Sequence, residues 1–175
     1  MANPKRIAIL ATDGFEQSEL MEPRKRLKDA GFQVDVIAPK PGEIRGWKEK
    51  EWGDTVAVDV ELSKAAPEDY DALVLPGGQM NPDVLRMESA AVEFVRAFDQ
   101  AGKPLAAICH APWLLVEAGA VEGRELTSWP SLRSDLVNAG ANWKDAEVVV
   151  DAHLITSRKP DDIPAFTDAV IHALR

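Results

Sequence analysis

The sequence predicts an α/β fold, specifically a three-layer α/β/α sandwich around a parallel sheet with a small antiparallel flap. Two observations lead to this. Short apolar runs at residues 6–12, 33–39 and 70–75 are typical of strands buried on both faces, as in parallel sheets. Helical segments separate such runs, as strand–helix–strand units require. With 175 residues the chain suits one substantial core, so we expect a single domain over residues 1–175.

The elements of the first half follow from these patterns. The strand at residues 6–12 leads into a helix that begins near Glu16 and ends at Gly31, a residue typical of helix ends. Pro23 should bend or interrupt the first half of this helix. After the strand at residues 33–39, the stretch 42–62 combines tryptophans and charges with alternating apolar residues, which predicts the antiparallel flap.

The second half continues the alternation. Beyond the strand that exits through Pro76-Gly77-Gly78, we expect a helix at residues 83–100, a strand at 104–109, a helix from 113, a hairpin at 147–157 turning at Asp151-Ala152, and a closing helix at 161–174. Every strand of the predicted sheet therefore has a helix beside it.

Composition narrows the function classes. Twenty Lys and Arg against 29 Asp and Glu give a formal net charge of −9, which argues against a nucleic-acid partner. No apolar stretch approaches membrane-spanning length, so we expect no membrane partner. The single cysteine excludes an internal disulfide, and without a signal-peptide pattern the chain is expected in a reducing cytoplasm.

The single cysteine, Cys109, is the most informative residue. It ends an apolar strand pattern, and His110 and then a helical run follow it directly. A strand that turns sharply into a helix holds a nucleophile at the sheet's carboxyl edge, beside unpaired N–H groups that favour a thiolate. We therefore expect Cys109 to be a thiolate at neutral pH. The alternative is an inert buried cysteine that packs as a small apolar residue.

Five segments together resemble the PfpI family. This family joins an intracellular protease, bacterial general stress proteins and the parkinsonism-associated deglycase within the class I glutamine amidotransferase-like superfamily. The resemblance lies in residues 14–20, 73–78, 107–112, 126–130 and 145–151. It implies a flavodoxin-like topology, with the site at the carboxyl ends of the parallel strands.

The resemblance also assigns roles to the residues around the sulfur. Position alone leaves Glu16 and Glu19 as equal candidates for an acid beside Cys109, and the family pattern favours Glu19 as a general acid/base with a raised pKa. The Gly77-Gly78 turn and the N–H of His110 would form an oxyanion hole. A tight turn is the structural alternative for the two glycines.

His110 would be oriented by an acidic residue of a second subunit. Asp83 matches that position, which gives a Cys-His-Asp triad assembled across an interface of a homodimer or higher homo-oligomer. Two features depart from the family, because glutamate is common there and the loop before Asp83 is slightly longer. Asp83 also suits the start of a helix after Pro82.

No cofactor or metal is expected. His153 and His172 lack metal-ligand spacing with each other or with Cys109, and no glycine-rich phosphate loop is present. Trp129 is expected to form a wall of the site, or else to serve as packing area.

These features predict a stress-response cysteine hydrolase that acts on reactive carbonyls, as a deglycase or glyoxalase-like enzyme. Its substrates would be small carbonyls or glycated side chains. A peptidase using the intersubunit triad is one alternative. A redox-sensing or chaperone-like protein that works through oxidation of Cys109 is another.

Overall fold

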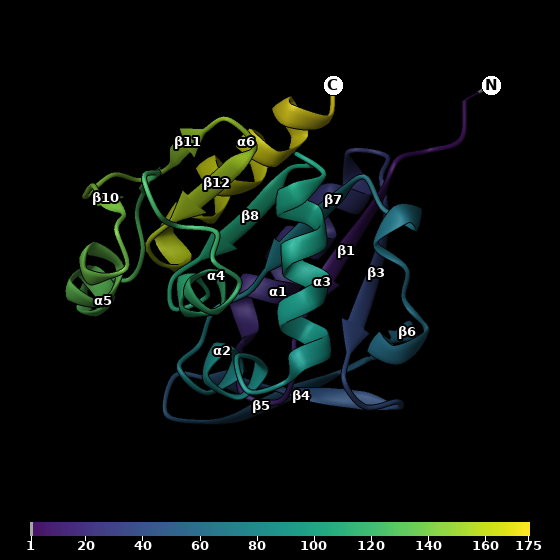
Figure 1. Cartoon of the computed structure of the whole chain (residues 1–175). Coiled ribbons are helices and arrows are strands. Elements are labelled where there is room, and N and C mark those ends of the chain that lie inside the picture. The colour runs from purple at the N-terminus through teal and green to yellow at the C-terminus, as the bar shows by residue number, and fades with distance from the viewer. Residues whose placement is uncertain (1) are drawn as a thin grey trace.

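A seven-stranded sheet forms the centre of the computed structural model, which describes residues 2–175 (Figure 1). Its strands run in the spatial order β11-β12-β8-β7-β1-β3-β6. They are β1 (Arg6–Leu10), β3 (Gln33–Ala38), β6 (Val60–Glu61), β7 (Ala72–Leu75), β8 (Leu105–Ile108), β11 (Val149–Asp151) and β12 (Leu154–Ser157).

The order of the parallel strands confirms the predicted fold class. The strands β3, β1, β7, β8 and β12 are parallel neighbours, and in chain order they read 2-1-3-4-5, the flavodoxin-like arrangement. β6 extends one edge in parallel, and β11 extends the other edge antiparallel to β12. Because the chain changes direction across the sheet between β1 and β7, a crevice is expected at the carboxyl ends of these strands.

Helices cover both faces of the sheet (Figure 1). α1 (Gln17–Asp29) and α6 (Ile163–Leu174) lie on one face, and α3 (Ser89–Gln100) and α4 (Pro112–Glu117) lie on the other. Successive strand residues point to opposite faces, so Ile9 packs with the α1 side and Leu10 with the α3 side.

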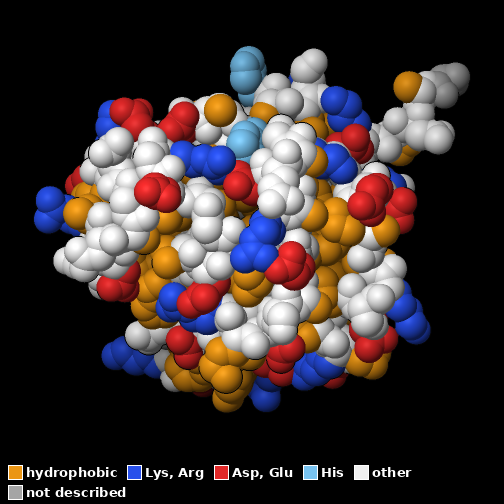
Figure 2. Space-filling view, in the orientation of Figure 1, with side chains coloured by type: hydrophobic (Ala, Val, Ile, Leu, Met, Phe, Trp, Pro, Cys, Tyr) orange, Lys and Arg blue, Asp and Glu red, His pale blue; other side chains and the backbone are white. Residues whose placement is uncertain are grey.

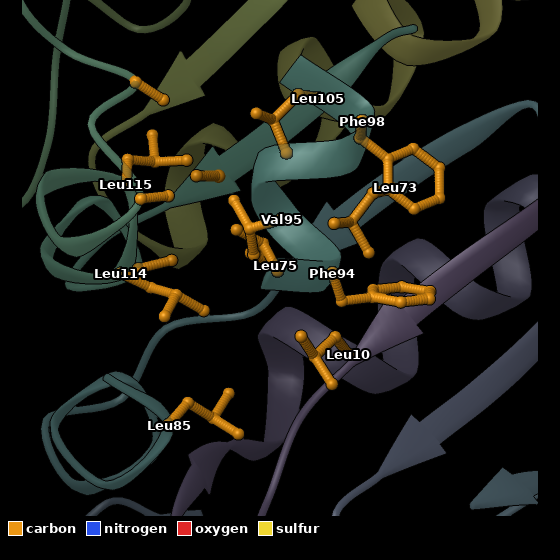
Figure 3. Packing of buried hydrophobic residues seen from close by; sticks show 14 of the residues in the cluster. Leu10, Leu73, Leu75, Leu85, Phe94, Val95, Phe98, Leu105, Leu114 and Leu115 are labelled. Atoms are coloured by element: carbon orange, nitrogen blue, oxygen red, sulfur yellow. The ribbon is translucent and has the colours of Figure 1, made fainter. Parts of the chain in front are cut away.

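The α3 face shows how the strands hold the helices. Figure 3 shows Leu73, Leu75 and Leu105 of the central strands pointing toward Phe94 and Phe98 of α3. All five side chains are almost fully buried, and a Leu or Phe that is fully buried contributes roughly 1.5–3 kcal/mol. This packing fixes the carboxyl ends of β7 and β8 side by side.

The expected flap is present beside the main sheet. β4 (Glu43–Lys48) and β5 (Glu51–Ala57) form an antiparallel hairpin, with a register shift between Arg45 and Trp47. β2 (Phe15–Glu16) joins it in parallel at the start of α1. The flap is thereby attached where the first strand leads into the first helix.

Two helix predictions need correction. The helix expected at residues 83–100 is two helices, α2 (Met80–Leu85) and α3, because Glu88 adopts an extended conformation that redirects the chain. In contrast, Pro23 does not interrupt α1, which continues through this buried residue, while a bend there stays a prediction. Proline has no N–H, so the carbonyl of Glu19 lacks its usual helical donor there.

The carboxyl-terminal third differs in smaller ways. Asp151 pairs with Leu154, so the hairpin turns at Ala152-His153, one residue later than predicted. α6 begins at Ile163 after a short 3-10 turn. The segment between α4 and β11 holds elements that the sequence did not indicate: β9 (Glu125–Leu126), α5 (Arg133–Asn138) and β10 (Asn142–Trp143), with β9 and β10 paired in parallel.

The surface carries charges of both signs. Acidic and basic side chains are interspersed over the face shown in Figure 2, so the net charge of −9 forms no single block there. No helix within residues 2–175 is long and apolar enough to cross a membrane.

Candidate active site

Cys109 lies at a sharp turn between β8 and α4, as the sequence predicts. Its φ of +65° is in the left-handed region, which costs a non-glycine residue about 1–2 kcal/mol. Two backbone hydrogen bonds hold it there. The N–H of Cys109 donates to the carbonyl of Ser157 (3.0 Å), and the N–H of Trp129 donates to the carbonyl of Cys109 (2.8 Å). The turn therefore places the sulfur at the carboxyl edge of the sheet.

Glu19 is the buried acid beside the sulfur. Its side chain is fully buried, and its Oε1 accepts a hydrogen bond from the N–H of Gly77 (3.0 Å). Burial raises the pKa of Glu19 to about 8; the charge of Glu16 also raises it, while the Gly77 N–H and Cys109 lower it. Glu19 therefore holds a proton at neutral pH.

Glu16 occupies a different environment. It belongs to β2, is partly exposed and lines the opening to the sulfur, and burial raises its pKa. Of the two glutamates that the sequence left open by position, Glu19 is the one that interacts directly with Cys109.

The environment of Cys109 opposes the expectation of a thiolate at neutral pH. Burial raises the pKa of the thiol and the nearby Glu19 carboxyl raises it further, whereas the N–H groups of Gly78 and His110 donate to the sulfur and lower it. Glu19 and Cys109 therefore titrate as a coupled pair. Because the thiolate is the nucleophilic form of a cysteine, attack by the sulfur would require the tautomer in which the remaining proton lies on Glu19 and the sulfur carries the charge.

The two glycines of the Pro-Gly-Gly turn have different tasks. The N–H of Gly77 is used by Glu19, so Gly77 is not free to serve as the expected oxyanion donor. A Cβ on Gly77 would lie 2.5 Å from Glu19 Oε1 and 2.7 Å from Cys109 Cβ. Because Gly77 has no side chain, the Glu19 carboxyl can lie close to the Cys109 sulfur. Gly78 supplies an N–H that donates to this sulfur.

His110 contacts the sulfur directly. Its Nδ1 lies 3.2 Å from Cys109 Sγ. The imidazole ring stacks on Trp129 (5.9 Å between centroids) and meets Trp113 edge-on (5.3 Å). Burial lowers the pKa of His110, so the ring is neutral at physiological pH and can accept a proton.

Asp83 lies apart from this group within one chain. It is an exposed residue of α2 and does not line the opening to Cys109. Its expected contact with His110 of a second chain stays a prediction.

Asn81 is a structural member of the site that sequence reasoning missed. It is buried, accepts a hydrogen bond from the N–H of Thr12 (2.8 Å), and donates to the carbonyls of Pro76 (2.9 Å) and Gly77 (3.2 Å). Asn81 thereby joins the ends of β1 and β7. The signal available in the sequence was its place directly before Pro82, in a segment that the structure folds as the start of α2.

A cleft of about 360 Å³ lies over Cys109. The lining residues are Glu16, Glu19, Trp47, Glu49, Gly78, Gln79, Cys109, His110, Trp129 and Pro160. Trp47 and Glu49 come from the flap, so two separate sheets contribute to the walls. Within residues 2–175, no group of three or more His, Cys, Asp or Glu side chains is placed to hold a metal ion.

Comparison with known families agrees with this geometry. Residues 5–173 match the model of the DJ-1/PfpI family. The chain belongs to the DJ-1/PfpI family. The resemblance in the five sequence segments is thus confirmed across nearly the whole chain.

Three relatives within the DJ-1/PfpI family illustrate the range of names. The chain is 42% identical to the putative cysteine protease YraA of Bacillus subtilis, covering 98% of this chain and 99% of the relative. It is 43% identical to protein/nucleic acid deglycase 2 of Escherichia coli (97% and 98% covered). It is 45% identical to general stress protein 18 of Bacillus subtilis (93% of each).

A solved structure shows the same fold. A two-domain protein from Anabaena variabilis with DJ-1/ThiJ/PfpI-like and ferritin-like domains superposes with a TM-score of 0.92 at 36% identity. The match covers 97% of this chain and 48% of that protein, so the chain spans about half its length.

The raised pKa of Glu19 should make the free energy of unfolding depend on pH. The carboxyl titrates near 4.5 when unfolded and at about 8 when folded, so the folded state binds more protons between these values. Its stabilising contribution is full below pH 4.5 and is lost as the pH rises to 8. Relative to Glu19→Gln, the wild type should lose about 1.4 kcal/mol per pH unit in urea unfolding across this window. If the free energy of unfolding depended on pH equally in the wild type and in Glu19→Gln, the raised pKa of Glu19 would be contradicted.

Alkylation of Cys109 by iodoacetamide should rise with pH in two steps in the wild type. The first step reflects loss of the shared proton from the Glu19–Cys109 pair, and the second reflects full ionisation. Glu19→Gln cannot ionise, so its profile should be a single step, whereas Glu16→Gln should keep two steps. Mass spectrometry gives the rates. A single step in both the wild type and Glu19→Gln would show that the pair is not coupled.

Removing the amide of Asn81 should destabilise the protein. Asn81→Ala loses three hydrogen bonds and leaves the buried N–H of Thr12 unpaired, which costs about 2–4 kcal/mol. The exposed Asn138→Ala is the matched control and should cost little. Denaturant unfolding measures both, and equal effects would refute the role of Asn81.

Proposed function

We propose that the protein is a cysteine-dependent hydrolase of reactive carbonyls, a deglycase of the PfpI type with a role in stress response. The observation that carries the proposal is the Glu19–Cys109 pair at the base of a small cleft, with the N–H groups of Gly78 and His110 directed at the sulfur. The names deglycase and general stress protein among relatives of similar length support it. A cytoplasmic location is part of the proposal, since reducing conditions keep the lone thiol free.

The chemistry follows from these groups. Cys109 Sγ attacks the carbonyl carbon, and the electron pair of the C=O bond moves to its oxygen. The N–H groups of Gly78 and His110 then donate to that oxygen. On the adjacent carbon the adduct's hydroxyl group gives its proton to His110 and becomes a carbonyl as the bond to the departing amine, guanidine or thiol breaks, and Glu19 protonates that leaving group. The alkoxide then re-forms its C=O bond and expels the Cys109 thiolate, water hydrates the released dicarbonyl, and the proton on His110 returns to Glu19.

Peptide cleavage is a second candidate, supported by the contact between His110 Nδ1 and Cys109 Sγ and by the name of YraA. An amide is less electrophilic than an aldehyde or ketone, and its amine is a poor leaving group. Amide cleavage therefore needs a well-oriented acid, which a single chain does not assemble around His110. Carbonyl chemistry needs only groups that already line the cleft.

We propose that the working form is at least a homodimer. Asp83 lies on α2 directly before the exposed Val84, and the exposed Met87 follows the end of this helix; the two apolar residues are 45% and 84% exposed. Exposed apolar side chains of this size suit a protein interface. A second copy packed on α2 would bring an Asp83 carboxyl toward another chain's His110.

Turnover of methylglyoxal adducts tests the proposed activity. Wild type should release free N-acetylarginine from its methylglyoxal adducts, and Cys109→Ser should show only the buffer-catalysed rate, because the sulfur forms the first bond. Nuclear magnetic resonance of the adduct provides the measurement. Equal rates in the two proteins would favour the redox-sensor alternative, and strong casein cleavage by the wild type would favour the peptidase.

Mixing two inactive variants tests the shared site. If Asp83 serves the partner's His110, which peptide cleavage needs, Cys109→Ser and Asp83→Asn should each lack peptidase activity. Random exchange of their subunits should restore about a quarter of the wild-type activity, because half the dimers are mixed and each has one complete site. Sedimentation measures the assembly. A fully active monomer, or no recovery in mixed dimers, would contradict the shared triad.

A further inference from the structure

The cleft over Cys109 is lined by several acidic residues and, among residues 2–175, by no lysine or arginine. Three of its lining residues are glutamates, namely Glu16, Glu19 and Glu49. Glu19 is fully buried, its Oε2 has no hydrogen-bond partner among residues 2–175, and it holds a proton at neutral pH, so the negative charge of the cleft comes from Glu16 and Glu49. A cleft of one charge sign enriches ligands of the opposite sign.

The aromatic walls reinforce this preference. Trp47 lines the cleft on the flap side and Trp129 on the side of the main sheet. Trp47 is held in place because its Nε1 donates to the carbonyl of Glu49 (3.0 Å) and its ring meets Trp52 edge-on (5.4 Å). Indole faces attract guanidinium and ammonium groups. The flap tip therefore combines a fixed indole with a carboxylate.

Among residues 2–175, no ion pair joins Glu16, Glu19 or Glu49 to a lysine or arginine. Arg158, close to Pro160 in sequence, is paired with Asp162 and Asp145. Arg45 of the flap donates to the carbonyl of Gly53. Lys50 faces a separate depression that it shares with Glu49 and Glu51.

We propose that Trp47 and Glu49 of the flap form a cation-recognising subsite of the cleft. The substrates favoured would carry a guanidinium or ammonium group near the reactive carbonyl, as adducts of arginine and lysine side chains do. Anionic adducts would be disfavoured. The preference for arginine and lysine adducts as substrates rests on the proposed function. The preference of the cleft for cations over anions does not depend on it.

Charged thiol reagents test the preference without turnover. Methanethiosulfonates carrying an ethyltrimethylammonium or an ethylsulfonate group have similar size and opposite charge. In each case the thiolate forms a disulfide with the reagent's thiol sulfur and methanesulfinate leaves. Rates at Cys109 are divided by each reagent's rate with 2-mercaptoethanol. The wild type should favour the cation, and Glu49→Gln should lower the cation-to-anion ratio by about threefold or more.

The controls separate the subsite from the general field of an acidic protein. Glu43→Gln removes the same charge at the other end of β4, away from the cleft, and should change the ratio much less. Trp47→Leu keeps every charge and should also lower the ratio. Glu49 is exposed, so Glu49→Gln should fold as the wild type does, which circular dichroism and unfolding measurements check.

The outcomes distinguish the two proposals. A wild-type ratio near one, or equal reductions in Glu49→Gln and Glu43→Gln, would overturn the cation subsite whatever the turnover. If the ratio behaves as expected and Glu49→Gln raises KM for the arginine adduct more than for the anionic N-acetylcysteine adduct, the subsite serves the proposed reaction. A preserved ratio with no turnover of any adduct would overturn the deglycase proposal and leave the subsite standing.

Discussion

The left-handed turn at Cys109 is the constraint on which the site depends. A non-glycine residue enters this region only when its surroundings hold it there, and the two backbone bonds of Cys109 to Ser157 and Trp129 do so. One bond comes from the neighbouring strand β12 and the other from the loop after β9. The sulfur therefore has a fixed position as long as the central sheet is intact.

Because the sulfur has a fixed position, the buried acid Glu19 can be held directly against it. Glu19 is brought against Cys109 by the start of α1, and the absence of a side chain at Gly77 provides the space between them. Burying an acid is costly because its ionised form loses hydration, and this cost keeps Glu19 protonated near neutral pH. The same packing that opposes ionisation of the thiol thus keeps on Glu19 the proton that the proposed reaction would use.

The sequence was sufficient to predict the fold class and the residues nearest the sulfur. It was not sufficient to predict the role of a residue when that role depends on a contact with a distant part of the chain. Apolar runs and the Cys-His step are local signals, so they predicted the parallel sheet and the turn at Cys109. The tasks of Gly77 and Asn81 depend on partners 58 and 69 residues away, Glu19 and Thr12, which no local pattern contains. Likewise, burial raises the pKa of the thiol through packing that sequence spacing does not reveal.

The flap differs from the rest of the cleft in how it is held. β4 and β5 contribute only Ile44 and Val56 as buried apolar side chains, whereas the central strands are buried along nearly their whole length. Segments with so little buried surface open locally at a lower free energy than the global unfolding of the protein. We therefore expect the flap to open as a separate cooperative unit, with amides that exchange with solvent hydrogen sooner than those of β7 and β8. Such opening would move Trp47 and Glu49 away from a sulfur that the central sheet keeps in place, and would give bulky ligands a route in and out.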